Sequence, residues 1–554
     1  MTERRLVLKI TELAGNYKNS LKTEFKGYNA KSFSKDLLAG ITVAAVALPL
    51  ALAFGVSSGA SAAAGLITAI MAGIVIGVLS GGSYQISGPT GAMTAILVSL
   101  VASYGLDGMF LACFISGIIL LLCGLFKVGG LVSFIPLPVI TGFTSGIAII
   151  IAFGQVNNLT GLKSEGDNTI EQFTSYFKLS QSLDTTSLII GLCVIAFMFL
   201  YPKKLNAICP SSLTAIILAV IVKIVLDLDV KSVGEIPKTL FLDSRLGFNS
   251  ISPSAIKNVL APAFSIAALG LIESLLCGAC AGRMKNEKLD ADRELISQGL
   301  GNMVIPFFGG VPATAAIART SVAVKAGGKT RLTGVFHSLV LLLSMFLLGP
   351  VMSKIPLSAL AGVLIVTAIR MNEWSVIKDI FHKKIKTAIF QFLITMVATV
   401  VFDLTIAILI GLAFSVIMFV VKVSDMQVVV SDVEQQRITG NGINPDKLEN
   451  VCVAYITGPL YFGTCNKLEE KLVPTDDSYS VILSMRGVPF ADISGINALH
   501  ELCEKLVSQG IMVYFTCVQP PVMDMLERAG LKERYKYDMF FWDTNKAFEH
   551  ISAL

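Results

Sequence analysis

Charge is scarce in this chain and unevenly distributed. Only 15% of its 554 residues are Asp, Glu, Lys or Arg, whereas 54% are hydrophobic, and the mean hydropathy is +0.72. No charged residue occurs from Leu37 to Leu106, and further uncharged runs cover 128–162, 185–202, 205–222 and 332–353. This composition excludes an ordinary soluble globular protein, because roughly 20 apolar residues suffice to cross a bilayer. We count about fourteen such segments between Asp36 and Lys422 and expect a polytopic α-helical membrane protein.

Residues for metal binding and covalent catalysis are equally sparse. The four His residues lie outside any cluster, and the C-x-x-C formed by Cys277 and Cys280 has no second pair or nearby His. No glycine-rich phosphate loop of recognised form is present. We therefore expect no enzymatic activity, no metal and no cofactor. The formal net charge of +5 reflects loop residues and gives no reason to expect nucleic-acid binding.

The basic residues predict the orientation of the segments. The N-terminal arm, 1–35, is rich in Lys and directly precedes the first apolar run, and later basic loops follow even-numbered crossings. Because basic loops stay on the cytoplasmic side, we expect both termini in the cytoplasm and the membrane domain at 36–424.

The chain changes character after Lys422. Apolar runs of strand length, 451–457, 481–485 and 511–518, alternate with charged, helix-patterned stretches that start near Lys467 and Ile496. We expect a cytoplasmic α/β domain over 430–554.

The membrane part resembles a duplication. Ile135-Pro136-Leu137 recurs as Ile355-Pro356-Leu357, an offset of 356 − 136 = 220, and Pro89 and Pro312 are separated by 312 − 89 = 223. The same offset carries Pro49, which we expect to break the first crossing, to a position near Glu273. About seven crossings per copy is an odd number, so the second copy enters the membrane inverted, as in many secondary transporters.

Each proline-containing break precedes a short apolar segment. We expect half-helices at 90–103 and 313–324, the first after 81–89 and the second after 309–312. Each would span roughly 20 Å at most, against about 30 Å of hydrocarbon, so each must begin near the middle of the membrane. The free N–H groups of two helix starts that meet there would attract an anion.

Two isolated charges accompany these breaks. Glu273 and Arg319 each lie alone within long uncharged stretches. A charge at bilayer depth is costly and is usually kept for a pathway or a partner. We interpret Arg319 as an anion-attracting residue and Glu273 as a proton carrier; the alternatives are a structural salt bridge between the two and a capping or packing role for Glu273.

Several motifs are similar to those of the sulfate permease (SulP) family, over nearly the whole chain from about Ser34. In the membrane domain they are Ile272-Glu273-Ser274-Leu275-Leu276, Gly299-Leu300-Gly301-Asn302, Phe308-Gly309-Gly310 and Ala315-Ala316-Ile317-Ala318-Arg319-Thr320. In the soluble domain, Gly458-Pro459-Leu460-Tyr461-Phe462-Gly463 and Asp492-Ile493-Ser494-Gly495 resemble the STAS domain of these proteins.

The resemblance implies fourteen segments in a seven-plus-seven inverted repeat, divided into a core and a gate, with elevator-like movement of the core. It also implies a homodimer in the bacterial cytoplasmic membrane and, because the acidic residue is glutamate, proton symport. The implied substrate-binding residues are Pro49, Phe54, Thr90, Gly91, Ala92, Thr314, Ala315, Ala316 and Arg319, with Glu273 completing the pocket and coupling to protons.

The identity of the anion stays open. Many family members have Gln and Ser where this chain has Leu50 and Ala318, so two hydrogen-bond donors are missing. Sulfate is expected from family frequency, and dicarboxylate and bicarbonate are alternatives. A passive anion channel or an anion-binding membrane sensor would share the fold.

The STAS-like domain has three interpretations: support of assembly or folding, regulatory docking, and nucleotide sensing. Ser494 matches a position that is phosphorylated in related stand-alone domains. The simpler expectation is that Ser494 is the N-cap of the following helix.

Overall fold

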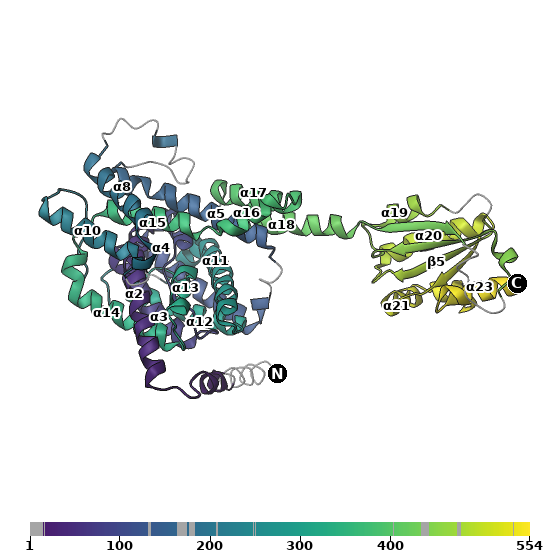
Figure 1. Cartoon of the computed structure of the whole chain (residues 1–554), viewed down its shortest axis with the longest axis horizontal. Coiled ribbons are helices and arrows are strands. Elements are labelled where there is room, and N and C mark those ends of the chain that lie inside the picture. Colours follow the sequence, from purple (N-terminus) through teal and green to yellow (C-terminus); the bar gives the residue numbers. More distant parts are fainter. Residues whose placement is uncertain are drawn as a thin grey trace. The chain divides into compact units, whose positions relative to one another are not determined.

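The computed structural model of the chain describes residues 15, 17–130, 135–162, 174–176, 183–206, 209–247, 249, 251–402, 404–433, 443–473, 478–535 and 537–554. It divides into two compact units, Met1–Leu412 and Ala413–Leu554, of which the first is helical and the second contains a β-sheet (Figure 1). The boundary between them falls inside the helix α18 (Leu404–Val423).

The first half of the membrane unit contains seven apolar segments in the described part of the chain. They are α2 (Ala30–Ser57), α3 (Ala62–Leu79), the two pieces of α4 (Gly91–Leu125), α5 (Leu137–Gly154), α8 (Thr185–Leu200) and α10 (Ser211–Val225). The short helices α6 (Val156–Thr160) and α9 (Lys203–Asn206) follow α5 and α8. Gly105, at φ 68° and ψ −173°, breaks α4, so its first piece is close to the half-helix predicted at 90–103.

The second half repeats this number among the described residues. Its segments are α11 (Pro253–Lys285), α12 (Ala291–Val304), α13 (Ile317–Lys325), α14 (Leu332–Met352), α15 (Leu357–Met371), α17 (Lys386–Val401) and α18. The 3-10 turn η3 (Ile305–Phe308) follows α12, and α16 (Trp374–His382) follows α15 at a bend of 40°. Six of the described helices are individually long and apolar enough to cross a membrane, and shorter apolar helices accompany them. The prediction of a polytopic helical membrane protein is confirmed.

Pro49 does not break the first crossing, so that prediction is wrong. The helix α2 continues through Pro49, which is buried, and begins where the Asn29 side chain accepts a hydrogen bond from Ser32 N at 3.0 Å. A proline inside a helix removes one backbone hydrogen bond, and packing by neighbouring helices lets membrane helices tolerate the loss.

The helices of the membrane unit pack in two groups. In one, α4 packs on α11 and α12, while α2 packs on α3 and α14; in the other, α15 packs on α5 and α8, α5 also packs on α17, and α8 on α10 (Figure 1). We name them the core group, to which α13 also belongs because it packs on α2 and α11, and the gate group. A large cluster of buried apolar side chains, from Ala44 to Ala368, fills the space between the helices.

The second unit is a five-stranded sheet with helices. Its strands are β3 (Gln427–Asp432), β4 (Val451–Thr457), β5 (Ser480–Gly487), β6 (Met512–Thr516) and β7 (Phe540–Phe541), in the order β3-β4-β5-β6-β7. The β3–β4 pair is antiparallel and the other pairs are parallel. Its helices are α19 (Cys465–Lys471), α20 (Ile493–Ser508), α21 (Pro520–Arg528), α22 (Leu531–Arg534) and α23 (Thr544–Ala553), and the 3-10 turns are η5 (Pro445–Leu448) and η6 (Tyr537–Met539).

The sheet has a hydrophobic core on each face, because successive side chains along a strand point to opposite faces. Residues such as Cys452 and Ala454 pack with α19, α20 and α21, whereas Val451 and Val453 pack with α23. The three predicted strands are confirmed, whereas β3 and β7 were missed. The strand β3 directly follows an apolar helix and β7 has two residues, so neither stands out as a separate period-2 segment.

Candidate anion site

Two short strands hold two helix starts side by side. The strand β1 (Ser87–Gly88) precedes α4 and pairs antiparallel with β2 (Thr314–Ala315), which precedes α13. Ala316 N extends this pairing by donating to Ile86 O at 2.9 Å. The antiparallel pairing means that the two chain segments run in opposite senses, as an inverted repeat requires. The free N–H groups of α4 and α13 therefore share one region, where they favour negative charge.

The second half-helix is shorter than predicted. It begins at Ile317 and not at Ala313, because residues 313–316 are extended and their backbone groups are bound elsewhere. The Asn302 side chain pairs with both backbone groups of Ala313, at 2.8 and 2.9 Å. Arg319 is therefore the third residue of α13, in its first turn, whereas a start at Ala313 would have made it the seventh.

Arg319 connects the two helix starts. Its side chain is 1% exposed, and Nη2 donates to the carbonyl oxygen of Pro89, just before α4. Nη1 has no hydrogen-bond partner among the described residues. Gly88 leaves room for the guanidinium: a Cβ there would lie 3.2 Å from Cζ of Arg319 and closer still to Nη1. A full positive charge thus reinforces the two helix starts.

Glu273 joins the start of α4 to the strand β2, which precedes α13, through one carboxylate oxygen. Oε2 accepts hydrogen bonds from the hydroxyl of Thr90, at 2.9 Å, and from the hydroxyl of Thr314, at 2.7 Å. The two hydroxyl oxygens lie 3.4 Å apart. The alternative of a direct salt bridge with Arg319 is wrong, since these two described residues form no ion pair and each has the partners named here.

A cavity of about 430 Å³ lies against these groups. The predicted site residues that line it are Phe54, Thr90, Gly91, Ala92, Glu273, Ala316 and Arg319. Pro49, Thr314 and Ala315 were predicted with them, but they are not on its wall: Pro49 is buried within α2, and the other two are buried in β2. Leu50 and Ala318 do line the cavity, so the positions where donors are missing face the site.

The opposite wall comes from the gate group. It is mostly apolar, with side chains from α5 and α15: Leu137, Ile140, Phe143, Thr144, Ile147, Ile151, Leu364, Thr367 and Ala368. Sequence analysis missed this wall, because apolar residues inside apolar helices carry no signal that separates a cavity wall from ordinary packing.

Among the described residues, three charged side chains line the cavity in addition to Glu273 and Arg319. Arg283, at the end of α11, and Arg370, at the end of α15, are exposed, as is Glu373. Arg370 Nη2 donates to Met198 O at 2.6 Å. Two arginines from different packing groups would attract anions toward the cavity. The sequence places both beside basic loops, and that signal alone does not distinguish them from topogenic charges.

A polar cradle supports the paired strands from behind. Gln298 Nε2 donates to Ser87 Oγ and to Glu294 Oε1, both at 2.8 Å, and Ala315 N donates to Ser274 Oγ at 3.2 Å. Ser274 and Asn302 thus give the non-helical backbone partners that lipid cannot supply, while Gln298 ties the Ser87 side chain to α12. The motif sequences contain Asn302 and Ser274, but no periodicity predicts what they bind.

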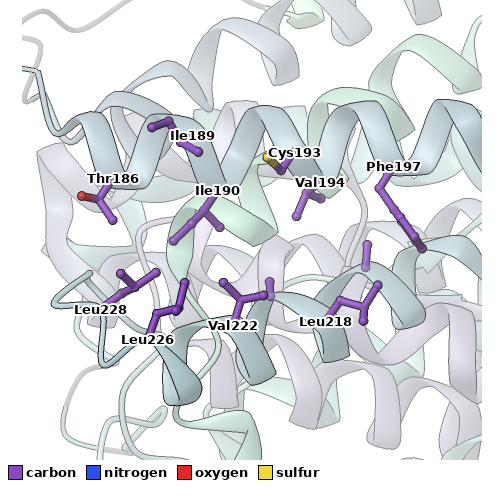
Figure 2. A pocket seen from close by; sticks show the side chains of 12 residues that line it. Thr186, Ile189, Ile190, Cys193, Val194, Phe197, Leu218, Val222, Leu226 and Leu228 are labelled. Carbon is purple, nitrogen blue, oxygen red and sulfur yellow. The ribbon is translucent and has the colours of Figure 1, made fainter.

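A second pocket of about 430 Å³ lies between α8 and α10 (Figure 2). Its side chains from the two helices face one another and are almost entirely hydrocarbon, with Thr186 and Cys193 as the exceptions. Nothing on its wall carries a charge, so it does not suit an anion.

In the sheet unit, Asp492 and not Ser494 caps α20. Asp492 Oδ1 accepts a hydrogen bond from Gly495 N at 2.8 Å, and its other oxygen accepts one from Phe462 N at 3.2 Å. The helix starts at Ile493, so Ser494 lies inside its first turn and is partly exposed. The N-cap interpretation of Ser494 is wrong, and its regulatory interpretation stays a prediction.

Comparisons with known proteins agree with this architecture. Residues 33–398 match the model of the sulfate permease family, and residues 443–543 match the STAS domain. The chain is 33% identical over 538 residues to the putative sulfate transporter YvdB of Bacillus subtilis, covering 93% of this chain and 97% of that protein.

Two solved structures are similar to it. The murine Slc26a9 anion transporter in the inward-facing state superposes with a TM-score of 0.81 at 19% identity, covering 94% of this chain and 91% of that one. The transmembrane domain of a cyanobacterial bicarbonate transporter, BicA, superposes with a TM-score of 0.63 at 29% identity, covering 70% of this chain and 98% of that one.

Proposed function

Because the chain belongs to the sulfate permease family of anion transporters, we propose that it takes up sulfate or a similar small anion together with a proton. The observation that carries the proposal is the junction of two half-helix starts on one cavity, with Arg319 beside it and Glu273 bound to Thr90 and Thr314. The helix starts and the guanidinium attract the anion, and the carboxylate accepts the proton.

Elevator-like movement accounts for access from both sides. Thr90, Glu273 and Arg319 come from the core group, whereas the gate group contributes a wall that is mostly apolar, with Arg370 at its end. Sliding the core group along that wall would carry the anion without breaking polar contacts between the two groups. Cavities at such junctions of broken helices are typical of secondary transporters.

The family resemblance and the basic loops support the remaining assignments. We place the chain as a homodimer in the bacterial cytoplasmic membrane, with both termini and the sheet unit in the cytoplasm. Residues 1–35, 36–424 and 430–554 are then the cytoplasmic arm, the transport domain and the STAS domain.

Bicarbonate is the second candidate substrate. BicA, whose transmembrane domain superposes on this chain, is a bicarbonate transporter, and Leu50 and Ala318 leave the cavity with few donors for the four oxygens of sulfate. A dicarboxylate such as succinate is the third candidate.

Uptake by purified protein in proteoliposomes tests these proposals. Labelled sulfate, bicarbonate and succinate are offered with and without an inward proton gradient. We expect accumulation of one of them that depends on the gradient. Uptake that ignores the gradient would contradict symport and favour a channel or an exchanger, and absence of uptake for every anion would favour an anion-binding sensor.

A further inference from the structure

Thr90 belongs to two environments at once. Its hydroxyl donates to Glu273 Oε2, and the residue also lines the anion cavity. Thr314 makes the equivalent bond to the same oxygen but is not on the cavity wall. Of the two hydroxyls that hold the carboxylate, only that of Thr90 can turn toward an anion.

A hydroxyl group has a single proton to donate. While Glu273 is ionised, it accepts the hydrogen bond from the Thr90 hydroxyl. Thr90 then presents only oxygen lone pairs to the cavity, and these repel an anion. A protonated carboxyl group is a weaker acceptor and carries a donor of its own. Once Glu273 takes up a proton, the Thr90 hydroxyl is free to rotate and donate to the anion.

We propose that Thr90 is the residue that couples the two cargoes: its hydroxyl binds Glu273 when that carboxylate is charged and binds the anion when it is protonated. The proposal rests on the proposed function of the site. It makes proton and anion binding mutually favourable, because each ligand raises the affinity for the other by the same factor. Thr314 keeps the carboxyl group in place in both states.

Other charged groups do not replace this route. Arg319 faces the junction from α13 and keeps its charge in both states, while Arg283 on α11, Arg370 at the end of α15 and Glu373 after α15 are exposed. Along α11, Cys277 and Cys280 are the other titratable groups near Glu273. From neighbouring helices, the buried Glu294 of α12 acts electrostatically on Cys277, and the buried His337 of α14 interacts with Arg319. The core helix α2 and the gate helix α5 contribute no charged side chain to the cavity wall that the structure describes.

A purely Coulombic coupling is the competing explanation, since protonation also removes a negative charge near the anion. The two explanations differ for Thr90→Val, which keeps the shape and removes the hydroxyl. The experiment measures the Kd of the anion that the wild type transports best, among sulfate, bicarbonate and succinate, over a series of pH values corrected for the protonation of the anion itself. Wild-type affinity should rise as the pH falls, by up to roughly tenfold per pH unit for one linked proton.

For Thr90→Val we expect affinity at low pH to fall by about tenfold or more, the value of one hydrogen bond to a charged group. Affinity at high pH should change by less than about threefold, because the hydroxyl is then bound to Glu273. Thr90→Ser should keep the wild-type profile. Thr94→Val is the matched control, since the Thr94 hydroxyl is bound to Gly91 O within the same helix, and its profile should equal that of the wild type.

A Thr90→Val profile with the full wild-type span, or one weakened equally at both pH limits, would overturn the proposal. If Thr90→Val does not fold, Thr90→Ala removes the same hydroxyl. A Glu273→Gln protein whose affinity still varies with pH as in the wild type would overturn proton coupling itself, and absence of anion binding would overturn the proposed function. If Glu273→Gln removes the pH dependence but Thr90→Val retains it, only the role of Thr90 fails.

Discussion

Replacing Gly88 by alanine should weaken anion binding without removing any charged group. An alanine Cβ would stand 3.2 Å from Cζ of Arg319 and inside the contact distance of Nη1, so the guanidinium has to move. Its bond from Nη2 to Pro89 O is then lost or lengthened. The displaced guanidinium would then no longer donate to the anion. A hydrogen bond from a charged donor is worth about 1.5–3 kcal/mol, so the loss of one such bond to the anion corresponds to a rise of roughly 10- to 150-fold in Kd.

Equilibrium binding of the labelled anion to purified protein measures this effect, alongside thermal unfolding. Gly77→Ala is the matched control: Gly77 is a buried helical glycine in α3 with nothing within 4 Å of an added Cβ, so it should bind the anion like the wild type. Arg319→Lys should resemble Gly88→Ala, because a compact ammonium group lacks the planar fork of donors. A folded Gly88→Ala protein with wild-type Kd would refute the idea that the position of Arg319 controls affinity.

Three further perturbations test separate parts of the structure. Glu273→Gln should abolish gradient-driven accumulation in proteoliposomes but leave anion exchange within about fivefold of wild type, because an amide still accepts hydroxyl bonds and cannot carry the proton; accumulation at the wild-type level would contradict this. Asn302→Leu leaves both backbone groups of Ala313 without partners, so it should destabilise the protein by about 2–5 kcal/mol, seen as a lower Tm, and an unchanged Tm would show that water replaces the amide. Asp492→Ala removes the N-cap of α20 at a cost of about 1–2 kcal/mol, which should speed hydrogen exchange in the first turn of that helix roughly 5- to 30-fold. Ser494→Ala should leave exchange there nearly unchanged. Equal effects of the two substitutions would contradict the assignment of the cap.

The sequence predicts the membrane architecture well because hydrophobic length is a direct physical requirement of a bilayer. The uncharged run from Leu37 to Leu106 and the glycine-rich break at 81–89 are sufficient to locate the short helix after Pro89, which ends at Gly105 in the structure. The isolation of Glu273 and Arg319 identifies both as residues of the junction, since charge at that depth needs a reason.

What the sequence does not predict are contacts between distant segments. Residues 313–316 have helix-compatible composition, but their pairing with β1 and the Asn302 amide keeps them extended, so α13 starts later than expected. Pro49 was expected to break a helix by local propensity, whereas tertiary packing keeps α2 intact. The Thr90 and Thr314 bonds to Glu273 join three segments, and no spacing in the chain indicates them.

Locating a bound anion by anomalous scattering is the most direct test of the account. A crystal of the protein with selenate or bromide should show its anomalous peak in the cavity between the start of α4, at Gly91 and Ala92, and the start of α13, near Ala316. A peak elsewhere in protein that is active in transport, for example in the apolar pocket between α8 and α10, would contradict the claim that the two opposed helix starts hold the anion.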